Sequence, residues 1–133
     1  TCHWRDGDYL YWHGHAHARN CSGAVGSRVC INLCSLDGLV LARSAFHHSV
    51  NYRSVTLFGV PELVTDHHEK QRQLQIFIER LQHGRWQQLR PVREEEVRAT
   101  AVVRMAIHEG SARCARGRRW TTAAISIGRS GLE

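Results

Sequence analysis

The sequence predicts a mainly β, α+β fold in which one helix packs over the strands of a single domain. Short apolar runs separated by Gly-containing turns recur through the first 60 residues, and another lies at residues 100–108; such runs are typical of strands. One long stretch, from Asp66 to Leu81, instead repeats apolar residues at helical spacing. The 133 residues give room for one hydrophobic core.

Composition and charge exclude several classes of protein. Net charge is +6, from 17 arginines and one lysine against 12 acids, but the arginines are spread along the chain without a recognised binding motif, so we expect no nucleic-acid partner. No apolar run approaches the roughly 20 residues that span a bilayer. The five cysteines are odd in number and form no C-x-x-C, which favours a reducing compartment. We expect a cytoplasmic protein without membrane contact or a metal site.

The first elements are a hairpin turn at Asp6-Gly7 and a strand over Tyr9–Trp12. The chain starts in mid-pattern, so we expect the domain's first strands to be incomplete here. Residues 13–20 read as a turn whose backbone amides, together with Arg19, suit a phosphate. The histidines at 13, 15 and 17 would share one face of a strand, which leaves a metal site open, although nothing completes a ligand set.

The middle of the chain carries the densest polar chemistry. A strand begins at Val29, Asp37-Gly38 predicts a hairpin, and a further strand covers Val55–Val60. Between them lies a polar corner, made of His47, His48, Ser49, Asn51, Tyr52, Arg53 and Ser54. Arginine and hydroxyl groups bind phosphate and flat side chains pack on rings, so the corner suits a phosphate-bearing, ring-containing ligand. An ordinary polar loop is the alternative. Two cysteines four residues apart, Cys30 and Cys34, are expected to be small core residues.

The second half begins with a helix that we expect to act as a lid. Asp66 and Glu69 have the spacing of a capping box, and His83-Gly84 ends the helix. A short charged helix is expected over Val92–Arg98 and a last strand over Thr100–His108. The domain then covers residues 1–110, and residues 111–133 form an irregular tail.

Four stretches together resemble a known family. They are WRDGDYLYWHG at 4–14, LDGLVLARSAFHHSVNYRSVTLFG at 36–59, EKQRQLQIFIERLQHGRW at 69–86 and RPVREEEVRATAVVRMAI at 90–107. They resemble the FMN-binding split-barrel superfamily, and more closely its pyridoxamine 5′-phosphate oxidase-like flavin-nucleotide-binding proteins, which include the nitroimidazole resistance proteins. The resemblance implies a six-stranded split β-barrel with a lid helix, and a homodimer that binds one FMN in each of two interfacial clefts.

The resemblance also implies roles for particular residues. His13 matches the histidine that faces the flavin, and we expect it to be catalytic as a proton donor. The other expected cofactor-binding residues are Gly14, His15, Arg19, Asn51, Tyr52, Arg53 and Ser54. The turn after His13 departs from the family pattern, which usually has serine and a longer basic helix there.

These observations lead to one expected function and two alternatives. We expect an oxidoreductase that passes electrons from a reduced nicotinamide, NAD(P)H, through FMN to a small acceptor. The alternatives are a non-catalytic flavin-binding dimer and a split barrel that binds haem or a metal. We expect a homodimer, because apolar strand edges such as Val55–Val60 would otherwise face water.

Overall fold

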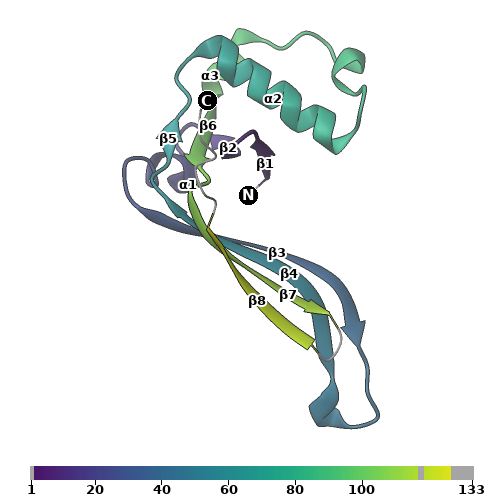
Figure 1. The fold of residues 1–133 in the computed structure, drawn as a ribbon. Coiled ribbons are helices and arrows are strands. Elements are labelled where there is room, and N and C mark those ends of the chain that lie inside the picture. Colours follow the sequence, from purple (N-terminus) through teal and green to yellow (C-terminus); the bar gives the residue numbers. More distant parts are fainter. Residues whose placement is uncertain (1, 117–118, 127–133) are drawn as a thin grey trace, which may run out of the picture. The chain divides into compact units, whose positions relative to one another are not determined.

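The computed structural model describes residues 2–116 and 119–126, with side chains as far as residue 115, and its described strands form two antiparallel four-stranded sheets (Figure 1). One sheet has the order β1-β2-β6-β5 and the other β3-β4-β7-β8. The strands are β1 His3–Asp6, β2 Tyr9–His15, β3 Val29–Val40, β4 Ser49–Gly59, β5 Glu62–Leu63, β6 Thr100–Ala106, β7 Glu109–Arg116 and β8 Arg119–Ser126. The helices are α1 Arg19–Ser22, α2 His67–Leu81 and α3 Glu94–Ala99, with 3-10 turns η1 Ala45–His47 and η2 Trp86–Gln88. The mainly β fold is confirmed, with eight described strands where six were expected.

The chain divides into two compact units. Unit 1 contains Thr1–Val29 and Val60–Ala106, and unit 2 contains Cys30–Gly59 and Ile107–Glu133. In the described part of the chain, no helix is both long and apolar enough to cross a membrane.

Unit 1 is held together by the hairpin β1–β2 and the long pairing of β2 with β6. The expected hairpin forms, with Gly7 and Asp8 as its loop residues because Asp6 still pairs with Tyr9. Gly7 has a φ of 57°, a conformation that glycine adopts at little cost. Trp4, Tyr11, Val64 and Val102 form a buried cluster. Apolar residues of α2 pack against the same cluster, namely Leu74, Ile76 and Phe77, so α2 is the expected covering helix.

Helix α2 begins and ends as its sequence indicates. The carboxylate of Asp66 accepts a hydrogen bond from the backbone N–H of Glu69 at 2.7 Å, which satisfies one of the donors that a helix start leaves unpaired. The helix ends at Leu81, and Gly84 just beyond it has a φ of 76°.

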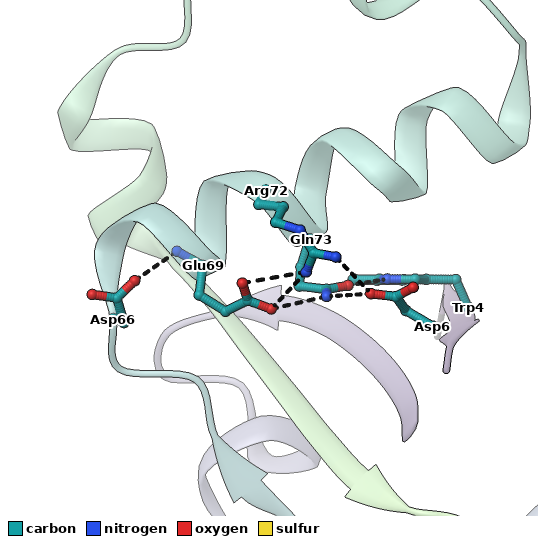
Figure 2. Close-up of polar contacts among 6 residues, drawn as sticks. All are labelled: Trp4, Asp6, Asp66, Glu69, Arg72 and Gln73. Carbon is teal, nitrogen blue, oxygen red and sulfur yellow. Dashed lines mark hydrogen bonds and ion pairs between the residues drawn. The ribbon is translucent and has the colours of Figure 1, made fainter. Parts of the chain in front are cut away.

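A buried glutamine fixes α2 to the first hairpin (Figure 2). The Gln73 side chain is 0 % exposed; its Oε1 accepts from Trp4 Nε1 at 2.9 Å, and its Nε2 donates to Asp6 at 2.9 Å and to Glu69 at 3.0 Å. Arg72 adds ion pairs to the same two acids. The oxygen and the nitrogen of this buried amide both have hydrogen-bond partners. Gln73 therefore joins α2 to the hairpin without the free-energy penalty of a buried, unpaired polar group.

In unit 2, the hairpin expected at Asp37-Gly38 does not form. Strand β3 runs through both residues to Val40, and the connection to β4 lies at residues 41–48. Asp37 is held there by a two-pronged ion pair with Arg53 of β4, at 2.8–3.1 Å. Gly38 does not have a positive φ, so the type of turn that favours Asp-Gly does not form.

The expected polar corner is also not a corner, since residues 49–54 form the first half of β4. Strand β4 is interior, with β3 on one side and β7 on the other, so Val55–Gly59 is not a sheet edge. Cys30 and Cys34, expected in the core, are exposed on β3.

The tail expected to be irregular contains two strands. Strand β7 pairs with β4 and β8 pairs with β7, so residues 109–116 and 119–126 complete the sheet of unit 2. Gly110 lies so close to β4 that a Cβ there would be 2.8 Å from the carbonyl oxygen of Thr56. The small residues of β7 give it little apolar character, so the sequence pattern does not indicate a strand. The strand forms because it pairs with β4 on one side and β8 on the other. Residues 127–133 of the expected tail lie outside the described residues.

Candidate functional site: a histidine in an apolar pocket

Unit 1 contains a pocket of about 240 Å³ with His13 in its wall. Phe77 of α2 and Trp86 of η2 give it aromatic walls. The remaining lining residues are Gln71, Leu74, Ile78, Leu89, Val92 and Thr100. Apart from His13, the glutamine and the threonine, every lining side chain is apolar or aromatic. Such walls, mainly apolar and aromatic with a few polar groups among them, suit a flat organic ligand.

The His13 ring lies among aromatic rings. Its centroid is 4.8 Å from that of Phe77 and 5.9 Å from that of Trp4. Its Nε2 is buried and has no hydrogen-bond partner among the described residues. Buried polar atoms are nearly always paired, so an unpaired one calls for an explanation.

Burial determines the charge of His13. Desolvation lowers the pKa of its imidazole below the ordinary value of 6.5, because an apolar environment disfavours the cation. The ring is therefore neutral at pH 7. Depending on the tautomer, Nε2 of a neutral imidazole donates a hydrogen bond, or it accepts one or ligates a metal. The lowered pKa makes proton donation by the imidazolium at neutral pH less favourable than an ordinary pKa would.

The residues expected to bind phosphate in unit 1 lie beside His13 in the chain. Gly14 and His15 complete β2, and the exposed Arg19 is the first residue of α1. A Cβ at position 14 would be 2.8 Å from Sγ of the fully buried Cys21, so this packing accounts for the glycine without a ligand. The ring centroids of His15 and His17 are 5.5 Å apart, yet the described residues contain no group of three or more side chains that could hold a metal ion.

The other four expected residues lie on β4 in unit 2, where neighbouring side chains point to opposite faces. Asn51 and Arg53 therefore share one face, and Tyr52 and Ser54 the other. The guanidinium of Arg53 donates to Asp37, and these hydrogen bonds raise its pKa. With the arginine side chain 61% exposed and the carboxylate 29% exposed, this ion pair is one that solvent screens.

The structure thus divides the expected site residues between two units. His13, Gly14, His15 and Arg19 belong to unit 1, whereas residues 51–54 belong to unit 2. Sequence reasoning missed the second wall of the His13 pocket, which Trp86, Leu89 and Val92 supply. The available signal was the apolar spacing of these three residues in a segment otherwise rich in arginine and glutamine.

Glu79 holds that second wall in place. Its carboxylate accepts from the backbone N–H of Gly84 at 2.7 Å and from that of Trp86 at 2.8 Å. These hydrogen bonds hold the pKa of Glu79 below its ordinary value of 4.5. The charged carboxylate therefore anchors the turn that carries Trp86 to α2.

Glu79→Gln should loosen this turn, because an amide offers one neutral acceptor in place of two charged ones. Hydrogen exchange at the amides of Gly84 and Trp86 should become several times faster, while Glu95→Gln, an exposed change on α3, should leave it unchanged. Because the folded pKa is depressed, the anchor should hold fully above about pH 4.5 and weaken as the pH falls below that value. Equal protection of both amides in the variant and the wild type would show that Glu79 does not anchor the turn.

Comparison with known proteins shows the family of the chain. Residues 1–114 match the sequence profile of the family described as pyridoxamine 5′-phosphate oxidase. No curated protein sequence matches the chain.

Three solved structures are similar to this fold. The flavocytochrome Anf3 from Azotobacter vinelandii has 34% sequence identity and a TM-score of 0.79, over 98% of this chain and 67% of that one. The FAD and heme binding protein from Mycobacterium smegmatis has 28% identity and a TM-score of 0.77, over 92% and 67%. A putative 5-nitroimidazole antibiotic resistance protein from Bacteroides thetaiotaomicron has 18% identity and a TM-score of 0.61, over 83% and 63%. The expected split-barrel fold is thereby confirmed, and this chain spans about two thirds of the length of each of these proteins.

Proposed function

Because the chain belongs to the pyridoxamine 5′-phosphate oxidase-like family, we propose that it is a flavoprotein that passes electrons from NAD(P)H through FMN to a small acceptor. The observation that carries this proposal is the family match over residues 1–114. The matched range includes His13, and it ends before residue 115, the last residue whose side chain is described. Similarity to a flavocytochrome and to an FAD and heme binding protein supports a flavin in this fold. A bound FMN would supply the hydride and electron transfer.

The protein's own residues would position the flavin and keep water out. The flat, apolar surroundings of His13 fit a ring, with Phe77 and Trp86 excluding solvent. Gly14, His15 and Arg19 follow in the chain and would hold the phosphate through backbone amides and charge. The other residues that we propose to bind the flavin belong to β4 of unit 2, and they are Asn51, Tyr52, Arg53 and Ser54.

We assign the same chain a second candidate function, haem binding. It is favoured by one observation, the buried and unpaired Nε2 of His13 in an apolar pocket. Neutral imidazole in apolar surroundings is a common axial ligand of haem iron. Because both groups are proposed for the pocket that contains His13, flavin and haem are exclusive alternatives at this site.

An absorption spectrum of the purified protein tests both functions. A flavin gives two bands in the near-ultraviolet and blue, and haem gives a sharp Soret band. Extraction of the cofactor and chromatography against FMN and FAD standards then identifies the flavin. Flavin bands with NAD(P)H-dependent bleaching and reoxidation by an acceptor would support an oxidoreductase, whereas flavin without turnover would support a binding protein. A protein that takes up neither FMN, FAD nor haem would refute both functions.

Arg53 offers a sharper test of the flavin site. Its guanidinium is bound to Asp37, so the two partners of this ion pair can be replaced separately and their effects on flavin binding compared. If Arg53 contacts the flavin phosphate, Arg53→Ala should weaken flavin binding roughly tenfold or more in Kd, because one charge-assisted contact is lost. Asp37→Ala should leave flavin affinity equal or higher, since it frees the guanidinium. A flavin titration of both variants decides between the roles: unchanged affinity in Arg53→Ala would leave Arg53 only its ion pair within unit 2.

We also propose a homodimer, in the cytoplasm. Strand β3 is an edge of its sheet and large apolar side chains on it and on the following connection are exposed, namely Leu36, Leu39, Leu41 and Phe46. Such exposed apolar groups beside an unpaired strand edge favour association. The five free cysteines suit a reducing compartment.

Light scattering at micromolar concentration should give the mass of a dimer. The double variant Leu39→Asp with Leu41→Asp should give a monomer, because two charges would have to be buried in the interface. Leu81→Asp is the matched control, since Leu81 is similarly exposed but lies at the end of α2. A wild-type protein that is monomeric at this concentration would contradict the dimer.

A further inference from the structure

Unit 1 contains a second pocket, of about 340 Å³, that the proposed function does not use. It shares only Thr100 with the lining of the His13 pocket. Its walls come from β5, β6, α2, α3 and the segment around α1. Its volume is at the lower end of the roughly 300–1,000 Å³ of ligand pockets, which suits a small molecule rather than a dinucleotide.

The walls of this pocket combine an apolar surface with two cations. Val25, Leu63 and Ala101 supply apolar surface, while Lys70 of α2 and Arg98 of α3 supply positive charge. The hydroxyl of Ser22 lies in the same lining but donates to the carbonyl oxygen of Ala18 at 3.2 Å. The pocket therefore offers partly exposed apolar side chains together with two positively charged ones.

The two cations have no acidic partner among the described side chains. Within the same unit, Arg72, Arg90 and Arg104 each form an ion pair with a glutamate. Lys70 instead donates from Nζ to the carbonyl oxygen of Val97 at 3.1 Å. This contact fixes the position of the ammonium group and uses one of its three donors. A half-buried lysine and an exposed arginine that line the same pocket without a counter-charge favour an anionic ligand.

We propose that this pocket binds a small organic anion whose apolar body packs on Val25 and Leu63 and whose carboxylate or phosphate is held by Lys70 and Arg98. The inference goes beyond the proposed function, because none of these residues is assigned to flavin or haem. The shared chemistry is one anionic group on a compact apolar body.

Calorimetric titration of the full chain with three probes of similar size tests the proposal. The probes are benzoate, phenyl phosphate and uncharged benzyl alcohol. At least one of the two anions should bind, and benzyl alcohol should bind at least tenfold more weakly, since it lacks the charge-assisted contacts. The tighter of the two anions identifies the carboxylate or the phosphate class.

Two variants assign the binding to this pocket. Arg98→Gln should weaken binding of the anion roughly tenfold, and Lys70→Gln should have a similar effect. Arg80→Gln is the matched control, because it removes the same charge from an exposed residue of α2 outside the pocket lining. Melting temperatures and cofactor content are measured for each variant, so loss of folding or of flavin is recognised separately. The proposal is overturned if neither anion binds, if benzyl alcohol binds equally well, or if Arg80→Gln weakens binding as much as Arg98→Gln.

Discussion

Replacing His13 with alanine should lower the rate of acceptor reduction per bound flavin by roughly 10²–10⁴-fold, the range for loss of one general acid. The protein should stay folded, because Nε2 of His13 has no hydrogen-bond partner among the described residues and its removal leaves no group unpaired. In a haem-loaded sample the same change should remove the axial ligand and shift or abolish the Soret band. His68→Ala is the control, since His68 is exposed on α2 and does not line the pocket. Unchanged flavin reoxidation and an unchanged Soret band would leave His13 without either role.

The pH dependence of the wild type separates the two roles of His13. Burial lowers its pKa below 6.5, so the imidazolium that donates a proton becomes populated only as the pH falls below that value. A proton-donor role therefore predicts faster acceptor reduction per flavin in this acidic range. Iron ligation requires the neutral ring, so a ligand role predicts haem loss in the same range. The two roles predict opposite outcomes of one titration.

The dipeptide Asp-Gly shows how far local sequence specified this fold. The predicted hairpin forms, with Gly7 and Asp8 as its loop residues and a positive φ at Gly7. Asp37-Gly38 has the same local preference but continues a strand, because β3 pairs with β4, where Arg53 also holds the Asp37 side chain. The neighbouring strand, whose Arg53 is sixteen residues away, decides the second case, and a pattern confined to neighbouring residues cannot reveal it.

The candidate site was predictable only in part, because local patterns reveal some of its residues and tertiary contacts position the others. His13 could be singled out because a glycine and an aromatic strand adjoin it, and the stripe that includes Phe77 predicted the helix that covers it. Trp86 lies in a turn whose position depends on the carboxylate of Glu79 and two backbone amides. No periodicity encodes such a contact, so the second wall of the pocket became visible only in three dimensions.

Replacing Gln73 with leucine should lower the free energy of unfolding by about 3 kcal/mol, because it leaves a buried indole N–H without an acceptor and removes a donor to a carboxylate. Gln73 is fully buried, and its amide joins Trp4 to Asp6 and Glu69. Urea denaturation measures the loss. Gln75→Leu, an exposed change on the same helix, should alter stability by less than about 0.5 kcal/mol.

A double-mutant cycle with Trp4→Phe then tests whether the loss arises from the unpaired indole. Phenylalanine keeps an aromatic ring against Tyr11 and Phe77, whose centroids lie 5.7 Å and 5.1 Å from that of Trp4, but it has no N–H to satisfy. Replacing both hydrogen-bond partners by apolar groups costs less than removing one of them. The double variant should therefore be less destabilised than the sum of the two single variants, by about 1 kcal/mol or more. Additive losses would mean that the Trp4–Gln73 hydrogen bond does not fix α2 to the hairpin and that Gln73 acts through its carboxylate partners alone.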